Sequence, residues 1–173
     1  SALFWTYLTE QLGLTATEPQ RGADFILSFW QNAQTATNNG TIDLVGTLRT
    51  TIGQFNVAES LENLYQDFSI ANYTKLLDVS ALDNALRYKY RDENPGTADV
   101  YTSVSTAWDG ALPPAKGPQA DSVARWGSKY YVARPNADCI GVVGFIGDGD
   151  RAAYSLISIK GADKVDRLYK STT

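Results

Sequence analysis

Histidine is absent from the chain, and Cys139 is its single cysteine. Without an imidazole the chain cannot build a Ser-His-Asp or Cys-His catalytic arrangement, and it lacks the ligands of the usual His/Cys zinc site. A disulfide within the chain is excluded as well. Cys139 lies in an apolar run, residues 138–146, where a small buried strand residue is favoured over a reactive thiol.

Long apolar runs and basic clusters are also missing. No stretch approaches the roughly 20 apolar residues that span a bilayer, and the 15 basic residues are scattered through a chain whose net charge is −4. Nucleic-acid affinity depends on clustered Lys and Arg, so we expect neither a nucleic-acid partner nor a membrane span. The N-terminus starts directly in a helical pattern, which we expect of a fragment of a longer protein.

The composition is that of a globular protein. With 173 residues, 43% hydrophobic and 20% charged, the chain has room for one sizeable domain or two small ones. Abundant Thr, Asn, Ser and Tyr without cysteine pairs is typical of a bacterial surface or secreted protein. The sequence therefore predicts a secreted or cell-surface location.

The first part of the chain carries apolar stripes at helical spacing. The spacing predicts helices over residues 2–12, over 22–35, from a cap at Thr41 to about Gly53, and over 61–73 behind the N-cap Ser60. Gly13 is a natural stop for the first. Together they predict a four-helix subdomain over residues 1–78.

Aromatic residues dominate the first two helices. A ligand groove and a packed core are both possible interpretations, and the core is favoured because spaced aromatics on helices usually pack inside. Trp5 lies off the main stripe, and we expect it to contact chain outside this sequence. The residues of the stripe are Phe4, Trp5, Tyr7, Phe25, Phe29 and Trp30.

From residue 99 the apolar pattern changes to period two, with turn-rich connections. We expect a domain boundary near residues 78–86, and an antiparallel β-sandwich over residues 86–173. The fold class is therefore α+β. The expected strands are residues 86–91, 100–107, 123–133 (split at Gly127), 139–146, 152–159 and a last one near 167–170.

Several acidic residues could carry chemistry. Asp148 and Asp150 alternate with glycines as in a calcium loop, but a hairpin turn is favoured because further ligands are missing. Two carboxylates across a cleft would make a glycosidase, although the sequence places no pair there. The candidates are Asp67, Asp78, Asp83, Asp92, Glu93 and Asp99.

Aromatic residues in the strand region could form a sugar-stacking face. Alternation along a strand places Tyr130 and Tyr131 on opposite faces, so one of them belongs to a core. The predicted binding residues are Trp108, Trp126 and Tyr131.

The order of the segments resembles a known family. Phe4-Trp-Thr-Tyr-Leu-Thr-Glu-Gln-Leu-Gly13, Phe29-Trp30 and Leu61-Glu-Asn-Leu-Tyr-Gln-Asp-Phe-Ser-Ile-Ala-Asn-Tyr73 are similar to the helical C-terminal half of gluzincin-type (thermolysin-like) zinc metallopeptidases. The segments Leu86-Arg-Tyr-Lys-Tyr90, Leu112-Pro-Pro114, Ser128-Lys-Tyr-Tyr131 and Val143-Gly-Phe-Ile-Gly147 resemble the β-sandwich often appended to them.

This chain departs from the family where the chemistry is done. The His-Glu-x-x-His zinc motif is absent, so no catalytic or metal role passes to any residue here, and the resemblance implies zinc only in a part upstream of Ser1. We therefore expect no cofactor in this chain.

Three hypotheses follow. The first is a non-catalytic fragment of a secreted or surface metallopeptidase-like protein, a scaffold whose partner is the remainder of the parent. The second is a carbohydrate- or protein-binding module using the aromatic face. The third is the glycosidase.

Overall fold

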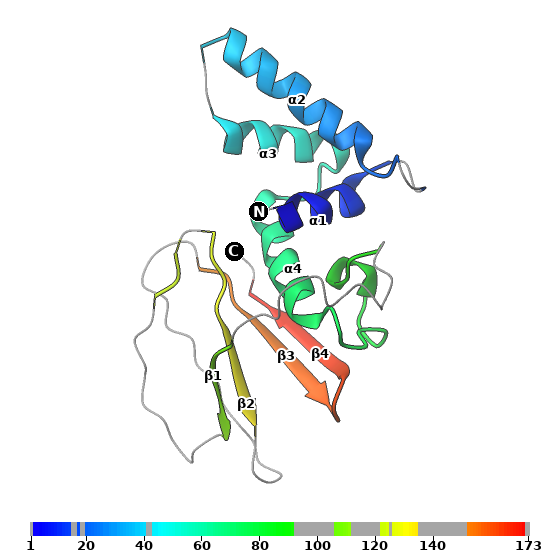
Figure 1. The fold of residues 1–173 in the computed structure, drawn as a ribbon, viewed down its shortest axis with the longest axis vertical. Helices are drawn as coiled ribbons and strands as arrows, with labels where there is room; N and C mark the ends of the chain where they lie inside the picture. Colours follow the sequence, from blue (N-terminus) through cyan, green and yellow to red (C-terminus); the bar gives the residue numbers. More distant parts are fainter. Residues whose placement is uncertain are drawn as a thin grey trace. The chain divides into compact units, whose positions relative to one another are not determined.

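The structure, a computed structural model, describes residues 2–14, 17, 20–40, 43–91, 106–111 (backbone), 122–124, 126–134 and 152–171. Within these ranges helices come first, as the α+β prediction requires (Figure 1). They are α1 (Ala2–Leu12), α2 (Ala23–Asn38), α3 (Leu44–Phe55) and α4 (Leu61–Thr74). A 3-10 helix, η1 (Ala85–Tyr88), precedes strands β1 (Thr106–Ala111), β2 (Tyr130–Arg134), β3 (Ser155–Lys160) and β4 (Lys164–Lys170).

Contacts between Cα atoms divide the chain into two units. The first unit joins Ser1–Ala98 to Ala153–Thr173, and the second is Asp99–Ala152. The first unit therefore holds the helices together with β3 and β4, whereas the second holds β1 and β2. The domain limits expected from the sequence, 1–78 and 86–173, stay a prediction.

The helix ends follow from local side-chain chemistry. Ser60 caps α4 as predicted, because its Oγ accepts a hydrogen bond from the backbone N–H of Asn63 at 3.1 Å. The predicted cap of the third helix was wrong. Asp43 takes that place, and its Oδ1 accepts from the N–H of Gly46 at 2.9 Å.

Two glycines bring the end of α1 against the start of α2. A Cβ on Gly13 would lie 2.5 Å from the backbone nitrogen of Gly22, and a Cβ on Gly22 would lie 2.2 Å from Cβ of Thr9. Gly22 also has a φ of 73°, in the left-handed region that side chains disfavour. Gly13 thus ends α1 as predicted, and it also leaves space for a second backbone.

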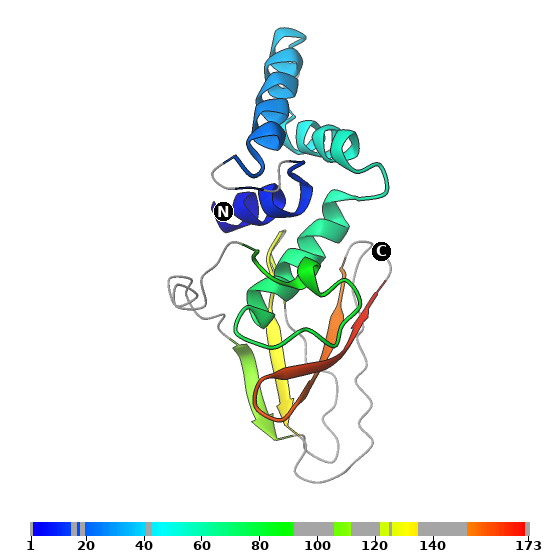
Figure 2. The same ribbon diagram turned by 90° about the vertical axis from the view of Figure 1, so that its right-hand side faces the viewer.

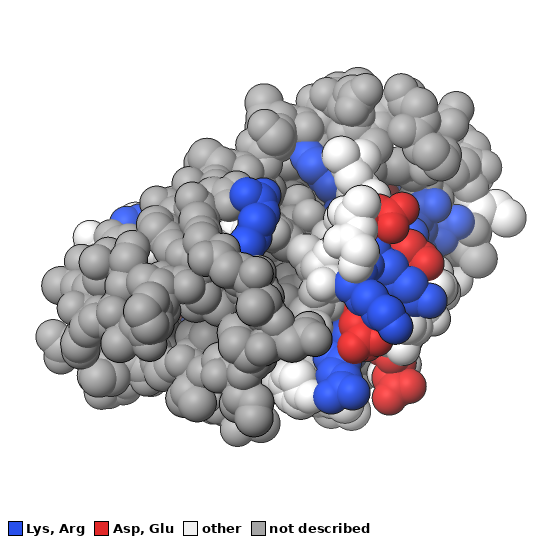
Figure 3. All heavy atoms as spheres, turned by 90° about the horizontal axis from the view of Figure 1, so that it is seen from below, with Lys and Arg blue, Asp and Glu red and all other residues white. Residues whose placement is uncertain are grey.

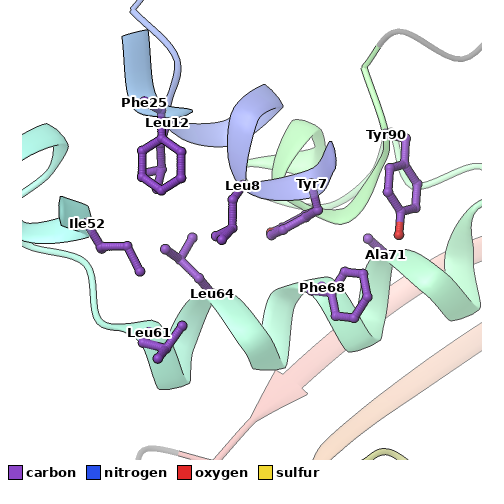
Figure 4. Packing of buried hydrophobic residues seen from close by; sticks show 10 residues of the cluster. All are labelled: Tyr7, Leu8, Leu12, Phe25, Ile52, Leu61, Leu64, Phe68, Ala71 and Tyr90. Carbon is purple, nitrogen blue, oxygen red and sulfur yellow. The ribbon is translucent and has the colours of Figure 1, made fainter. Parts of the chain in front are cut away.

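The core of the first unit lies between α1 and α4. Figure 4 shows Tyr7 and Leu8 of α1 pointing toward Leu64 and Phe68 of α4. Removing such side chains from water stabilises a fold by about 25 cal/mol per Å² of apolar surface. The cluster consists of Tyr7, Leu8, Leu12, Phe25, Ile52, Leu61, Leu64, Phe68, Ala71 and Tyr90.

Most of the aromatic stripe packs inside, as favoured from the sequence. The ring centroids of Phe4 and Phe68 are 5.0 Å apart. Trp5 packs on Phe29 of α2, with centroids 4.8 Å apart, so it has a partner within this sequence. Trp30 departs from the expectation, because its side chain is 63% exposed.

The predicted strand over residues 86–91 was wrong, because part of it is η1. Side chains of the helices bond its backbone in place of a neighbouring strand. Gln11 Nε2 donates to the carbonyl of Leu86 at 3.1 Å, and Thr74 Oγ1 donates to the carbonyl of Tyr88 at 2.8 Å. Glu10 Oε2 accepts from the N–H of Arg91 at 2.9 Å. Of the period-two apolar residues, Tyr88 and Tyr90 are buried, whereas Leu86 is 62% exposed.

Strands β3 and β4 form an antiparallel hairpin in the first unit. The hairpin lies alongside α4 in both views (Figures 1 and 2), where Gln66 Nε2 donates to the carbonyl of Tyr154 at 3.0 Å. The backbone of Asp78 bonds the turn end of the hairpin: its N–H donates to Asp163 O at 2.7 Å, and its carbonyl accepts from Val165 N at 2.8 Å. The predicted strands over 152–159 and 167–170 correspond to these two.

Strands β1 and β2 pair in parallel in the second unit, so the antiparallel prediction was wrong for this pair. Among the described residues of the predicted strand 123–133, strand structure begins only at Tyr130. This is after Gly127, where a break was expected. A β-sandwich is not confirmed, since the described strands form two sheets of two strands each. The predicted strand over residues 139–146 lies outside the described residues.

Substituting Gly22 tests the backbone contact between α1 and α2. Gly22→Ala is expected to lower the free energy of unfolding by at least about 1–2 kcal/mol, which is the cost of placing a residue with a side chain in the left-handed region. The close contact of the new Cβ with Thr9 is expected to add to this cost. Gly53→Ala is the matched control, since nothing lies within 4 Å of its Cβ position in α3. It is expected to raise stability by about 0.5–1 kcal/mol. Urea unfolding followed by circular dichroism measures both, and equal shifts would contradict the contact.

Candidate functional site

Two of the three predicted binding residues occupy paired positions in the second unit. The register of β1 and β2 sets Trp108 opposite Tyr131. The side chain of Tyr131 is 56% exposed. Residues paired across neighbouring strands are close enough to act on one ligand.

The third predicted residue, Trp126, lies in a turn just before β2. Its φ is 57°, which is uncommon for a bulky residue and costs about 1–2 kcal/mol. The N–H of Gly127 donates to the carbonyl of Ala124 at 2.8 Å and closes the turn. The indole is 37% exposed. An aromatic residue held in a strained, solvent-facing turn is a feature found at binding sites.

The carboxylates proposed for glycosidase chemistry have different environments. Asp67 is fully buried in α4. Asp78 is at the surface, where hydrogen bonds from Ser80 lower the pKa of its carboxyl. Asp92, Glu93 and Asp99 lie outside the described residues.

A cluster of charged side chains surrounds the buried carboxylate of Asp67. Its Oδ1 accepts a hydrogen bond from Nζ of Lys170 on β4 at 2.6 Å, and its Oδ2 lies 2.9 Å from Nη2 of Arg87 on η1. Oδ2 has no aligned hydrogen-bond donor in the described part of the chain, so the arginine charge is what compensates it. Arg87 also binds Glu59 through Nη1 at 2.7 Å. The four charges sum to zero, and each basic group holds an acid.

Tyr7 joins the charge cluster to α1. Its hydroxyl donates to the carbonyl of Arg87 at 2.9 Å. Burial, reinforced by the nearby Asp67 carboxylate, raises the pKa of Tyr7 far above the value of an exposed tyrosine. Glu59 and Asp67 in turn raise the pKa of Arg87. These pKa shifts keep Tyr7 neutral and Arg87 charged, so that Tyr7 donates its hydrogen bond and Arg87 keeps its ion pairs.

A shallow groove in the first unit, which we call the α2 groove, was missed from the sequence. It has a volume of about 400 Å³ and is mostly apolar. The signal that could have found it is a second apolar stripe on α2, beside the one that packs in the core. The lining residues are Thr9, Arg21, Gly22, Ala23, Ile26, Leu27 and Trp30.

Acidic and basic side chains are mixed on the surface. Figure 3 shows that where described charged side chains gather on the face drawn, acidic and basic groups lie next to one another. Arg49 and Glu62 also form an exposed ion pair, between α3 and α4. The described part of this face therefore offers no large patch of one sign.

No group of three or more His, Cys, Asp or Glu side chains in the described ranges could hold a metal ion. Asp148 and Asp150, the calcium alternative, lie outside those ranges. None of the described helices is long and apolar enough to cross a membrane.

Comparisons with protein-family models, with curated proteins and with solved structures each give no match.

The contribution of the Asp67 cluster to stability can be compared with that of the exposed ion pair between Arg49 and Glu62. Asp67→Ala is expected to lower the free energy of unfolding by about 2–4 kcal/mol, toward the lower end because Arg87 and Lys170 are partly solvated. Lys170→Met is expected to cost less, since Arg87 still compensates the carboxylate. Glu62→Ala is the control and is expected to change stability by about 0–1 kcal/mol. Guanidinium unfolding of the three variants measures the differences, and an Asp67→Ala cost no larger than that of Glu62→Ala would refute the assignment.

Proposed function

We propose that this chain is a non-catalytic binding part of a secreted or cell-surface bacterial protein, and that Trp108, Trp126 and Tyr131 contact its ligand. The observation that carries the proposal is the register pairing of Trp108 with Tyr131 on neighbouring strands. Exposure of Tyr131 and of the strained Trp126 turn adds to it.

The ligand that best fits such residues is a carbohydrate. Aromatic side chains present flat apolar faces with a polar edge, and they lose little conformational entropy on binding because they rotate about two bonds. A sugar ring has an apolar face of similar size with hydroxyl groups around it. A protein ligand with exposed aromatic or proline residues is the alternative, since the same side chains are enriched in protein interfaces.

The charged residues of the first unit support a structural role for it. Arg87 of η1 and Lys170 of β4 each form an ion pair with Asp67 of α4. A carboxylate that is fully buried and ion-paired in this way is not open to a substrate, either as a proton donor or as a nucleophile. The glycosidase hypothesis thus loses Asp67 as a candidate, and the helices act as a scaffold.

A relation to gluzincin peptidases is part of the proposal. It is supported by the order of aromatic segments, which pack in one core between α1 and α4. The parent would hold the zinc upstream of Ser1, with these helices beside its cleft. The upstream coding sequence is the test: a reading frame without a His-Glu-x-x-His helix would exclude an active parent peptidase.

Glycan binding tests the aromatic residues. A labelled sample of the chain is screened on a glycan array, and positive glycans are titrated by tryptophan fluorescence. Trp108→Ala, Trp126→Ala and Tyr131→Ala are each expected to weaken binding about 10-fold, equal to about 1.4 kcal/mol.

Two controls separate binding from folding. Trp126→Gly removes the indole at a position where glycine adopts a positive φ without strain, so its loss of binding cannot come from a strained backbone. Trp30→Ala removes an exposed indole in the first unit and is expected to leave glycan affinity unchanged. Absence of any glycan ligand, or unchanged affinity in all three alanine variants, would contradict the proposal.

A further inference from the structure

Several asparagine side chains are held in place by hydrogen bonds. Asn32 Nδ2 donates to Thr51 Oγ1 at 3.0 Å, and Asn72 Oδ1 accepts from the hydroxyl of Tyr90 at 2.7 Å. Asn39, the C-cap of α2, is different. It is exposed, and its side-chain amide forms no hydrogen bond with any described residue. The carboxamide of Asn39 is therefore open to reaction with water and with its own backbone.

The residue that follows Asn39 is glycine, and the sequence contains no second Asn-Gly pair. Gly40 has a φ of 74°, and nothing lies within 4 Å of a Cβ built on it. Because glycine has no side chain, its backbone moves over a wide range of φ and ψ. No Cβ at this position hinders the approach of the backbone nitrogen of Gly40 to the side chain of Asn39.

Two backbone hydrogen bonds close the end of α2. The N–H of Asn39 donates to the carbonyl of Thr35 at 3.1 Å, and the N–H of Gly40 donates to the carbonyl of Thr37 at 2.9 Å. The ψ of Asn39 is 8°, so this turn must open before the nitrogen of Gly40 reaches Cγ of Asn39. The opening is local and costs little, because residues 37–40 are all exposed and helix ends fray.

We propose that Asn39 is a site of spontaneous deamidation. With the turn open, hydroxide removes the proton from the N–H of Gly40, and the nitrogen attacks Cγ of Asn39 to form the C–N bond of a succinimide ring. The bond from Cγ to the side-chain nitrogen breaks, and this nitrogen takes a proton from water and leaves as ammonia. Water then opens the ring at either of its two carbonyls. The products are aspartate and isoaspartate at residue 39.

Both products change the end of α2. They place a carboxylate where the exposed carbonyls form the negative end of the helix dipole, and no basic residue lies in the last turn. In isoaspartate the backbone also runs through the former side chain, which lengthens the connection from α2 to α3. The site is in the first unit and is independent of the ligand proposed for the second unit.

Peptide mapping by mass spectrometry measures the reaction in the full chain. The folded chain is incubated at mildly alkaline pH, and the aspartate and isoaspartate fractions at each asparagine are followed with time. Asn56 is the internal control. It is the exposed C-cap of α3, but Val57 follows it and its Oδ1 accepts from the N–H of Ala58 at 3.1 Å. Asn39 is expected to react at least about 10-fold faster than Asn56, equal to about 1.4 kcal/mol in the barrier.

Three variants complete the test. Gly40→Ala is expected to slow the reaction at least about 10-fold, because a Cβ hinders the attack. Asn39→Gln leaves the turn glycine in place and is expected to keep its amide, since its longer side chain forms the ring more slowly. Val57→Ala changes the residue after Asn56 and is expected to leave the rate at Asn39 unchanged. Circular dichroism melting checks that each variant is folded.

The outcomes decide the proposal. Isoaspartate together with aspartate at residue 39 of the folded chain, slowed in Gly40→Ala and absent from Asn39→Gln, supports it. Aspartate without isoaspartate would indicate direct hydrolysis of the amide and would overturn the succinimide route. Equal rates at Asn39 and Asn56, or a reaction confined to chain unfolded in urea, would also overturn the proposal.

Discussion

The carboxylate of Asp67 is the charge around which the first unit is assembled. It is fully buried on α4, and it is compensated by Arg87 from η1 and Lys170 from β4. A buried carboxylate without such partners would cost several kcal/mol. Three separate segments, of which β4 is far from the other two in sequence, must therefore meet at one place. The hydroxyl of Tyr7 adds α1 to the same place through the carbonyl of Arg87.

The helices were predictable because their determinants are local. Apolar spacing and the Ser60 cap act within a few residues, and they located α1 and α4 closely. The start of α3 was missed because Thr41 and Asp43 are both capping residues, and spacing alone does not choose between them. Residues 86–91 were missed because Gln11, Thr74 and Glu10 bond their backbone from distant helices. Nothing within the segment signals those partners.

The same difference between local and distant determinants applies to the candidate sites. Aromatic residues in turn-rich strands indicated Trp108, Trp126 and Tyr131, but their pairing depends on a parallel register that the turns did not indicate. The α2 groove was missed because Trp30 shares helical spacing with core residues, and hydrophobicity alone does not tell which face is covered. The buried carboxylate of Asp67 and its two cations join segments of the first unit, while Trp30, Trp126 and Tyr131 stay exposed.

The first unit is formed by two separate segments of the sequence, and the ribosome makes these segments at different times. Asp67 and Lys170 are 103 positions apart, and all of the second unit, Asp99–Ala152, is synthesised between them. During translation the helices leave the ribosome while the carboxylate of α4 still lacks its lysine. Until the hairpin is complete, Arg87 is the one of the acid's two cations that is available to pair with it. The last strand therefore supplies the second cation of the Asp67 cluster only when synthesis of the chain is nearly complete.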